Sequence, residues 1–297
     1  MNKEKNRTFT GATAAIAAFS LWGAIPIYFK TVSQVPALEV LAHRVVWTVV
    51  FLGLIILFKG SMRDVFAIFK NKKLLFTLIL SSLLISTNWL VFIWAVAHDR
   101  LLEASLGYFT TPIVSVALGL FFLKEKLYRW QWLAVALSIL SVSNLIWSHG
   151  VFPWVAISVS ITFGLYGLVR KIAEVDAFSG LFIETTLIVL PMIAYLFFIG
   201  IDGTGAYGLT NIRITGLLMM AGLITATPLV LFAIATKKLK LSTVGFFQYI
   251  TPTGQFLLAV FLYNEPFLDT HLITFGTIWI ALAIYSFSSI TSQSKNN

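Results

Sequence analysis

The chain contains no cysteine and has few charged residues. Of its 297 residues, 11% are charged and 58% are hydrophobic. The absence of cysteine excludes a disulfide framework, a thiolate nucleophile and a cysteine-ligated zinc site. Soluble domains carry about 25% charged residues, so this chain has too few charges to coat a water-soluble globule. Its 15% aromatic content also excludes a disordered, solvating chain.

The motifs of several common chemistries are also missing. The sequence contains no G-x-x-x-x-G-K-[ST] run, which excludes direct drive by ATP through a phosphate-binding loop. It contains no H-E-x-x-H pair, and its histidines, His43, His98, His149 and His271, are scattered along the chain. Metal centres need clustered ligands. We therefore expect no metal, no cofactor and no enzymatic activity.

Long hydrophobic runs occupy nearly the whole chain. A helix that crosses a bilayer needs roughly 20 mostly apolar residues. Together these runs predict an all-α polytopic membrane protein with ten transmembrane helices. The predicted spans are 9–31, 38–58, 73–97, 101–123, 129–147, 151–170, 178–199, 212–236, 241–263 and 269–290.

The positive charges are concentrated on one side of this predicted topology. With the N-terminus in the cytoplasm, Lys30, Arg100 and Arg213 fall outside and Arg44 lies within a span, so 17 of the 21 Lys and Arg residues face inward. Cytoplasmic loops carry this excess in membrane proteins. We therefore predict that both termini are cytoplasmic. The same distribution explains the net charge of +9 without a nucleic-acid partner.

The two halves of the chain resemble each other. A shift of 140 residues superposes Pro112 on Pro252 and Glu125 on Glu265, and it aligns the apolar runs 89–95 and 229–235. We interpret residues 1–148 and 149–297 as two repeats. Each repeat holds five spans, an odd number, so the second must be inverted relative to the first. Inverted repeats suit alternating access, in which a central site opens to either side of the membrane in turn.

Six segments of the chain resemble a known family of membrane proteins: 43–47, 88–96, 102–109, 130–135, 166–171 and 241–250. The chain is similar to the drug/metabolite transporter superfamily, in its EamA-type branch. The resemblance implies a ten-helix secondary transporter in a bacterial inner membrane, with a central cavity for a small-molecule substrate and peripheral helices at 129–147 and 269–290. Lys124 and Asn264 stand where that family has a small residue.

Ionisable residues inside a membrane are costly and are functional hypotheses by default. In the predicted outer half of the bilayer, span 38–58 contains Glu39, His43 and Arg44, and Glu103 begins span 101–123. A buried arginine stays charged and needs a carboxylate. Because Arg44 and Glu103 lie at similar depth, we expect them to pair across their two helices.

Glu184 is the fifth such residue and occupies the repeat position of Arg44. Inversion places the two in opposite leaflets, roughly 12 Å apart in depth, so we disfavour a direct pair between them. Glu184 has Arg170, Lys171 and Lys240 as candidate partners. Arg44, Glu103 and Glu184 are candidates for gating or for coupling to an ion such as the proton. The alternative is that they form permanent ion pairs with a structural role.

The predicted binding site lies at mid-depth between the spans that contain Pro112 and Pro252. Each proline removes a backbone hydrogen bond and kinks its helix, and broken helices often line a transporter's site. Gln248 is expected to face the region of its repeat partner Tyr108. The other candidate lining residues are Asn88, Trp89, Tyr166 and Tyr249. Such a lining favours an uncharged or zwitterionic amphipathic solute, although each residue could instead serve packing alone.

The leading interpretation is a secondary transporter of a small organic solute, drug or metabolite, with export as the expected direction. An integral-membrane enzyme acting on lipid or prenyl substrates is the alternative. Such an enzyme needs clustered carboxylates or histidines at one interface, and the sequence does not supply them. A pore or scaffold is a third interpretation. A pore needs a repeated polar stripe, which the sequence also lacks. Membrane lipid surrounds the chain in each case, and a homodimer is a candidate assembly.

Overall fold

The structure of the chain is a computed structural model that describes residues 2–97, 101–147, 154–208, 211–262 and 269–295. Every regular element within these ranges is a helix, so the prediction of an all-α protein is confirmed there. The elements are α1 (Asn2–Thr31), α2 (Ala37–Phe58), α3 (Met62–Lys70), α4 (Lys72–Ala97), α5 (Leu101–Leu123), α6 (Arg129–Trp147), α7 (Trp154–Ile172), α8 (Ala177–Ile201), α9 (Ile212–Lys238), α10 (Leu241–Phe247), α11 (Ile250–Leu257), the π-helical η2 (Leu258–Leu262) and α12 (Asp269–Lys295).

Six helices within the described ranges are long and apolar enough to cross a bilayer. They are found in α1, α2, α4, α7, α8 and α9, and two shorter apolar stretches occur at Gly107–Leu123 and Gly276–Ser288. The chain is thus built as an integral membrane protein. Each of the ten predicted segments coincides with a helix or a broken helix. That all ten cross the membrane stays a prediction.

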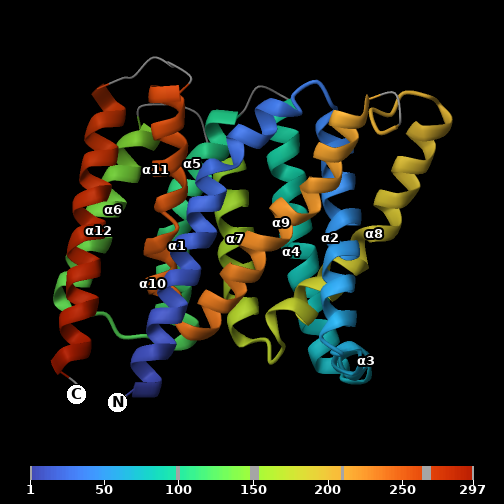
Figure 1. Cartoon of the computed structure of the whole chain (residues 1–297). Helices are drawn as coiled ribbons and strands as arrows, with labels where there is room; N and C mark the ends of the chain where they lie inside the picture. The colour runs from blue at the N-terminus through green and yellow to red at the C-terminus, as the bar shows by residue number, and fades with distance from the viewer. Residues whose placement is uncertain (1, 98–100, 148–153, 209–210, 263–268, 296–297) are drawn as a thin grey trace.

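The helix α3 was not predicted, because hydropathy alone marked its residues as a charged connection. Val65 and Ile68 on one side of α3 are buried against α2, α4 and α8, whereas Phe66 and Phe69 are exposed. Figure 1 shows α3 nearly end-on at the foot of the bundle, across the direction of the long helices. A short amphipathic helix in this position is typical of one that lies in the membrane interface.

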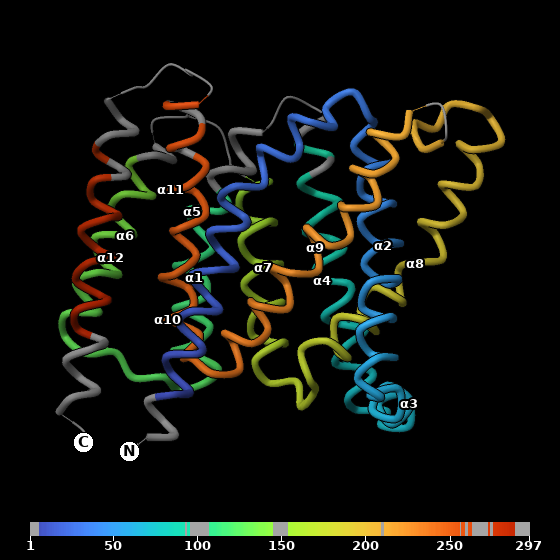
Figure 2. Tube along the Cα trace, viewed as in Figure 1, coloured from blue at the N-terminus to red at the C-terminus, as the bar shows by residue number. Residues whose placement is uncertain are grey.

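The predicted span 241–263 is broken into α10, α11 and η2. The break falls at Gln248 and Tyr249, because the ring of Pro252 clashes with a helical carbonyl four residues earlier. The Gln248 carbonyl accepts a shorter-range hydrogen bond from the Thr251 amide instead, at 3.1 Å. Figure 2 traces α10 and α11 as successive pieces beside α1. Pro112, which the 140-residue shift superposes on Pro252, lies inside the continuous helix α5.

Helices from the two halves of the chain pack against one another. Helix α1 packs against α9 and α11, while α7 packs against α4 and α5. Helix α2 contacts both α8 and α9, and α6 contacts α12 at one edge of the bundle (Figure 1). The first residues of α1 and the last of α12 lie at the same end of the bundle.

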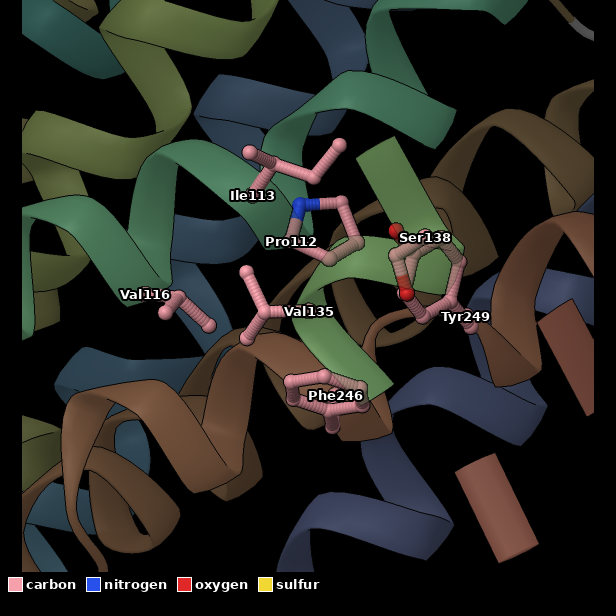
Figure 3. A pocket seen from close by; sticks show the side chains of 7 residues that line it. All are labelled: Pro112, Ile113, Val116, Val135, Ser138, Phe246 and Tyr249. Carbon is pink, nitrogen blue, oxygen red and sulfur yellow. The ribbon is translucent and has the colours of Figure 1, made fainter. Parts of the chain in front are cut away.

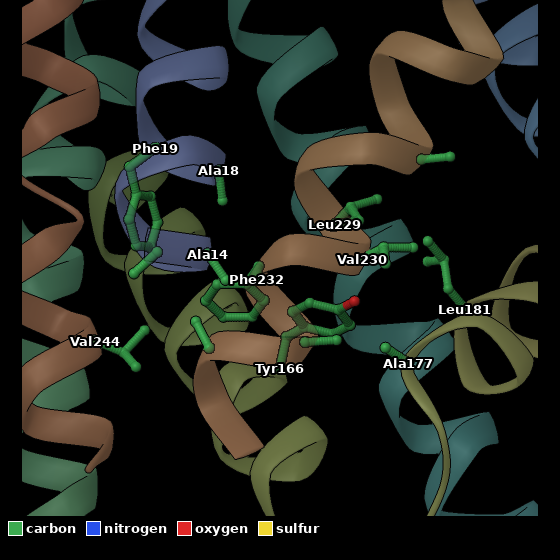
Figure 4. Close-up of a cluster of buried hydrophobic side chains, with 14 of the residues drawn as sticks. Ala14, Ala18, Phe19, Tyr166, Ala177, Leu181, Leu229, Val230, Phe232 and Val244 are labelled. Atoms are coloured by element: carbon green, nitrogen blue, oxygen red, sulfur yellow. The ribbon is translucent and has the colours of Figure 1, made fainter. Parts of the chain in front are cut away.

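The main apolar core ties α1, α7 and α9 together near the middle of the bundle (Figure 4). The ring of Tyr166 stacks on Phe232 with centroids 5.8 Å apart, and Phe19 meets the same phenylalanine edge-on at 6.1 Å. Aromatic pairs in these geometries stabilise a core beyond the area that they bury. This core fixes the helices that surround the charged residues described below.

Lys124, after the end of α5, has a backbone φ of 52°. Only glycine adopts this left-handed conformation without steric cost, so the lysine backbone is strained here. Lys124→Gly is therefore expected to raise the free energy of unfolding by about 1 kcal/mol, measured by thermal unfolding in detergent. Lys126→Gly, two residues along in the same connection, is the control. A variant at Lys124 no more stable than that control would contradict the prediction.

Candidate functional site

Arg44 projects from α2 into a half-buried aromatic setting. Its guanidinium carbon lies 5.4 Å from the ring centroid of Trp89 and 5.7 Å from that of Phe29. Its Nε donates to the hydroxyl of Thr225 on α9 at 2.8 Å. Among the side chains that the structure describes, no carboxylate lies within ion-pair distance of Arg44. The aromatic faces partly stabilise this desolvated cation, but its charge has no carboxylate counter-ion among the described side chains.

Glu184 on α8 lies in a fully buried polar cluster. Its Oε1 is 3.2 Å from Nη1 of Arg170 on α7, which is one of the three partners considered for it. The same oxygen accepts from the hydroxyl of Ser81 on α4 at 2.5 Å, and Oε2 accepts from the Tyr166 hydroxyl at 3.4 Å. Arg170 also donates to the Ala177 carbonyl. The cluster satisfies a buried carboxylate and joins α4, α7 and α8.

The structure therefore separates the two intramembrane charges as expected. Arg44 contacts α1, α4 and α9, and Glu184 contacts α4 and α7, with no contact between the two. The side chain of Glu103 lies outside the described residues, so its pairing with Arg44 stays a prediction.

Three of the predicted lining residues lie near Arg44 or on the helices beside it. Trp89 contacts the guanidinium directly, and half-buried Tyr108 packs its ring on Phe92 at 5.9 Å. Asn88 is buried, and its amide donates to the Val159 carbonyl at 2.9 Å and to the Thr162 hydroxyl at 3.1 Å. The amide of Asn88 thus joins α4 to α7 in this conformation.

The other three lie elsewhere. Tyr166 belongs to the Glu184 cluster and has no exposed surface. Gln248 and Tyr249 form the junction between α10 and α11, where the Gln248 amide and the Ser115 hydroxyl of α5 lie 3.3 Å apart. Ser115 is two turns along α5 from Tyr108. The six residues do not form one cluster in this conformation, and their role in binding stays a prediction.

A small pocket lies beside Pro112, between α5, α6 and α10 (Figure 3). Its cavity volume, measured as the space open to a water-sized molecule, is about 0 Å³, whereas most ligand sites have roughly 300–1,000 Å³. Its lining is mainly apolar. Figure 3 shows that the oxygens of Ser138 and Tyr249 lie on the same side of it. This pocket is too small for an amphipathic solute and does not include Arg44.

Two further polar residues have roles that hydropathy did not predict. Glu125 caps the start of α10: its carboxylate accepts from the Leu241 amide at 2.6 Å and from the Ser242 amide at 3.0 Å. Lys171 donates to the Thr236 and Leu239 carbonyls at the end of α9. Carboxylates favour helix N-termini and cations favour C-termini. The repeat register had singled out Glu125, but only the fold shows which helix end it contacts.

The sequence is similar to known membrane transporters. Residues 9–147 match the model of the EamA-like transporter family. Protein RarD of Salmonella typhi is 43% identical over 98% of this chain and 99% of its own length. An uncharacterised transporter of Vibrio cholerae is also 43% identical, over 96% of this chain and 95% of its own.

A solved crystal structure supports the same fold. It superposes with a TM-score of 0.71 over 94% of this chain and 98% of its own, at 14% identity. That likeness concerns the fold alone, whereas the curated relatives are similar over nearly their whole length. The chain therefore belongs to the EamA-like transporter family and is a membrane transporter related to the RarD proteins.

Proposed function

We propose that the chain exports a small zwitterionic, amphipathic solute across the bacterial inner membrane by alternating access, without enzymatic turnover. The observation that carries the proposal is Arg44, a half-buried cation among aromatic side chains with no acidic partner among the described residues. A carboxylate on the solute would balance Arg44, and the faces of Trp89 and Phe29 would receive its apolar part.

The helix contacts support two inverted repeats. If α1 corresponds to α7, α2 to α8, α4 to α9 and α5 to α10 with α11, the most extensive packings have counterparts. The pair α5 and α7 matches α11 and α1, the pair α4 and α7 matches α9 and α1, and α2 and α9 match α8 and α4. Helices α2 and α8 contact each other, as do α6 and α12, as expected of elements beside a pseudo-two-fold axis.

Individual contacts support the same relation. Along α1 the repeat register needs one extra residue of offset, 141 in place of 140, which makes Trp22 and Phe163 partners. Their rings meet edge-on at 5.7 Å. At Gly23, α1 approaches the backbone of Gly254 on α11, and an added Cβ would lie 3.4 Å from its Cα. Gly164, the partner of Gly23, approaches Val114, the partner of Gly254, on α5. Both crossings therefore involve equivalent positions.

The repeats differ at their charged positions, and this difference supports Arg44 as the point of solute attachment. Glu184 is neutralised by Arg170 from α7. The residue of α1 equivalent to Arg170 is Phe29, which offers Arg44 a ring but no opposite charge. In the empty carrier, Arg44 would pair with the carboxylate of Glu103. In the loaded carrier, it would pair with the carboxylate of the solute. This exchange of partners would couple solute binding to gating.

A thermal-shift screen followed by counterflow in proteoliposomes tests the proposal. Zwitterionic amphipathic compounds are expected to stabilise the wild type, and their carboxamide analogues are not. Arg44→Gln should abolish both stabilisation and counterflow, a loss of about 100-fold or more in apparent affinity, while Arg44→Lys should retain part of each. Tyr108→Ala, beside Arg44, should weaken binding without loss of insertion. Equal responses to acids and amides would overturn the carboxylate assignment.

The predicted contact between Arg44 and Glu103 has its own test. Removal of one partner of a buried pair costs about 3–5 kcal/mol, so Arg44→Gln and Glu103→Gln are each expected to destabilise the empty carrier. The double variant should lose less than the sum of the two. Strict additivity in this double-mutant cycle would show that the residues do not interact.

The proposed orientation predicts the activity of reporter fusions. A reporter fused after Asn297 should be active only in its cytoplasmic form, because both termini are expected inside. A truncated fusion after Thr204, between α8 and α9, is the control and should give periplasmic alkaline phosphatase activity. Phosphatase activity at Asn297 would contradict both the topology and the inverted repeat.

A further inference from the structure

Two ionisable side chains that the transport proposal does not use lie one turn apart on α2. Glu39 and His43 are 1% and 4% exposed. They belong to the first two turns of α2, and this helix begins at the end of the bundle opposite the termini (Figure 1). The Nε2 atom of His43 lies 3.9 Å from Oε1 of Glu39. That Glu39 oxygen also accepts a hydrogen bond from the Ala206 amide at 2.7 Å. Glu39 thus connects α2 to the loop 202–208, which joins α8 to α9.

The imidazole of His43 packs against the same loop. Its ring stacks on Tyr207, with centroids 4.8 Å apart and an angle of 25° between the planes. Neither ring nitrogen has a hydrogen-bond partner among the described residues. One turn further along α2, Trp47 lies 6.5 Å from Tyr207. A nearly fully buried imidazole with two unmatched nitrogens beside a carboxylate calls for an explanation.

Among the described residues, no other ion pair involves Glu39 or His43. Tyr195 on α8 lies within electrostatic range of Glu39, and Asp202 and Arg213, which flank the loop, are exposed. The side of α9 against this part of α2 carries Leu218 and Gly222. The buried Glu39 carboxyl has one backbone donor, the Ala206 amide, as its hydrogen-bond partner among the described residues.

We propose that Glu39 and His43 form a proton-binding site, and that its protonation holds loop 202–208 closed against α2. A proton on the imidazole makes an ion pair with Glu39, gives an N–H donor to an unmatched nitrogen and places a cation on the face of Tyr207. Loss of the proton leaves a buried carboxylate without a counter-charge. Histidine is the side chain whose unperturbed charge change falls nearest to neutral pH, and the site would bind its proton on acidification.

The site lies beside the proposed solute site on the same turn of α2. His43 faces the loop, and the next residue, Arg44, faces Phe29 and Trp89. A proton that closes the loop thus acts on the helix that carries the arginine. This part of the inference rests on the proposed function and makes loop 202–208 the gate at the end opposite the termini. The proton site itself needs no solute.

Hydrogen–deuterium exchange of loop 202–208 in the full chain tests the proton site, because the Ala206 amide is bonded to Glu39. The wild type is compared with His43→Gln at about pH 5.5 and about pH 8. The loop sequence is identical in both, so the ratio of their rates cancels the intrinsic pH dependence of exchange. The loop of the wild type should exchange about 5-fold more slowly than that of the variant at the acidic pH, and at a similar rate at the basic pH.

Two further variants sharpen the test. Glu39→Gln removes the anion and should abolish the extra protection at acidic pH even if His43→Gln fails to fold. Trp47→Phe keeps a ring beside Tyr207 and should behave as the wild type does. A ratio that is the same at both pH values, or acid protection that persists in Glu39→Gln, would overturn the proton site. Because no solute is present, that result would leave the role of Arg44 untouched.

Discussion

Glu184→Gln is expected to lower the free energy of unfolding by about 3–5 kcal/mol, because it leaves Arg170 charged and buried without a counter-ion. Both side chains of this pair are fully buried, at 3.2 Å. A glutamine keeps an oxygen for Ser81 but carries no charge. The loss should appear in thermal or SDS unfolding in detergent and as low yield of inserted protein.

The matched control is Glu174→Gln. Glu174 is an acidic residue exposed between α7 and α8, and exposed charges contribute about 0–1 kcal/mol. A double change of Arg170→Met with Glu184→Met removes both charges and should lose less than the sum of its single variants, since buried pairs are often replaceable by apolar residues. If Glu184→Gln is as stable as Glu174→Gln, the pair has no structural role.

Gly222→Ala is expected to lower the free energy of unfolding by about 2 kcal/mol or more, although alanine is the better helix former. An added Cβ at Gly222 would lie 2.4 Å from the carbonyl carbon of Trp47 and 2.6 Å from the amide nitrogen of Thr48. These are backbone atoms of α2 and cannot rotate away. Helices α2 and α9 would have to separate.

Separation of α2 and α9 would also disturb the proposed binding site around Arg44. The Thr48 hydroxyl donates to the Gly222 carbonyl at 3.1 Å, and Thr225, one turn further along α9, accepts from Arg44 at 2.8 Å. Gly222→Ala should therefore also weaken solute-induced stabilisation. Gly216→Ala on the same helix is the matched control, because a Cβ there meets nothing within 4 Å. That control is expected to stabilise the protein by about 0.5–1 kcal/mol. Equal stability of the two variants would show that the close approach is unimportant.

The class of the protein and the order of its helices follow from hydropathy and charge alone. Hydropathy predicted nearly every helix, because a span must bury about 20 residues of apolar surface whatever it packs against. It failed at α3, whose apolar residues contact other helices only on one side. Charge and register also drew attention to Arg44 and Glu184, because ionisable groups in a membrane are costly in any packing arrangement.

Which side chains contact each other depends on how the helices pack in three dimensions. Glu184 had three candidate partners in the sequence, and the rotation of α7 about its own axis selects Arg170. The partners of Arg44 and the contact of His43 with loop 202–208 likewise depend on helices distant in sequence. A hydropathy pattern records depth in the membrane but neither the neighbours of a helix nor its rotation. Those are set by close packing, such as the contact of Gly222 with Trp47.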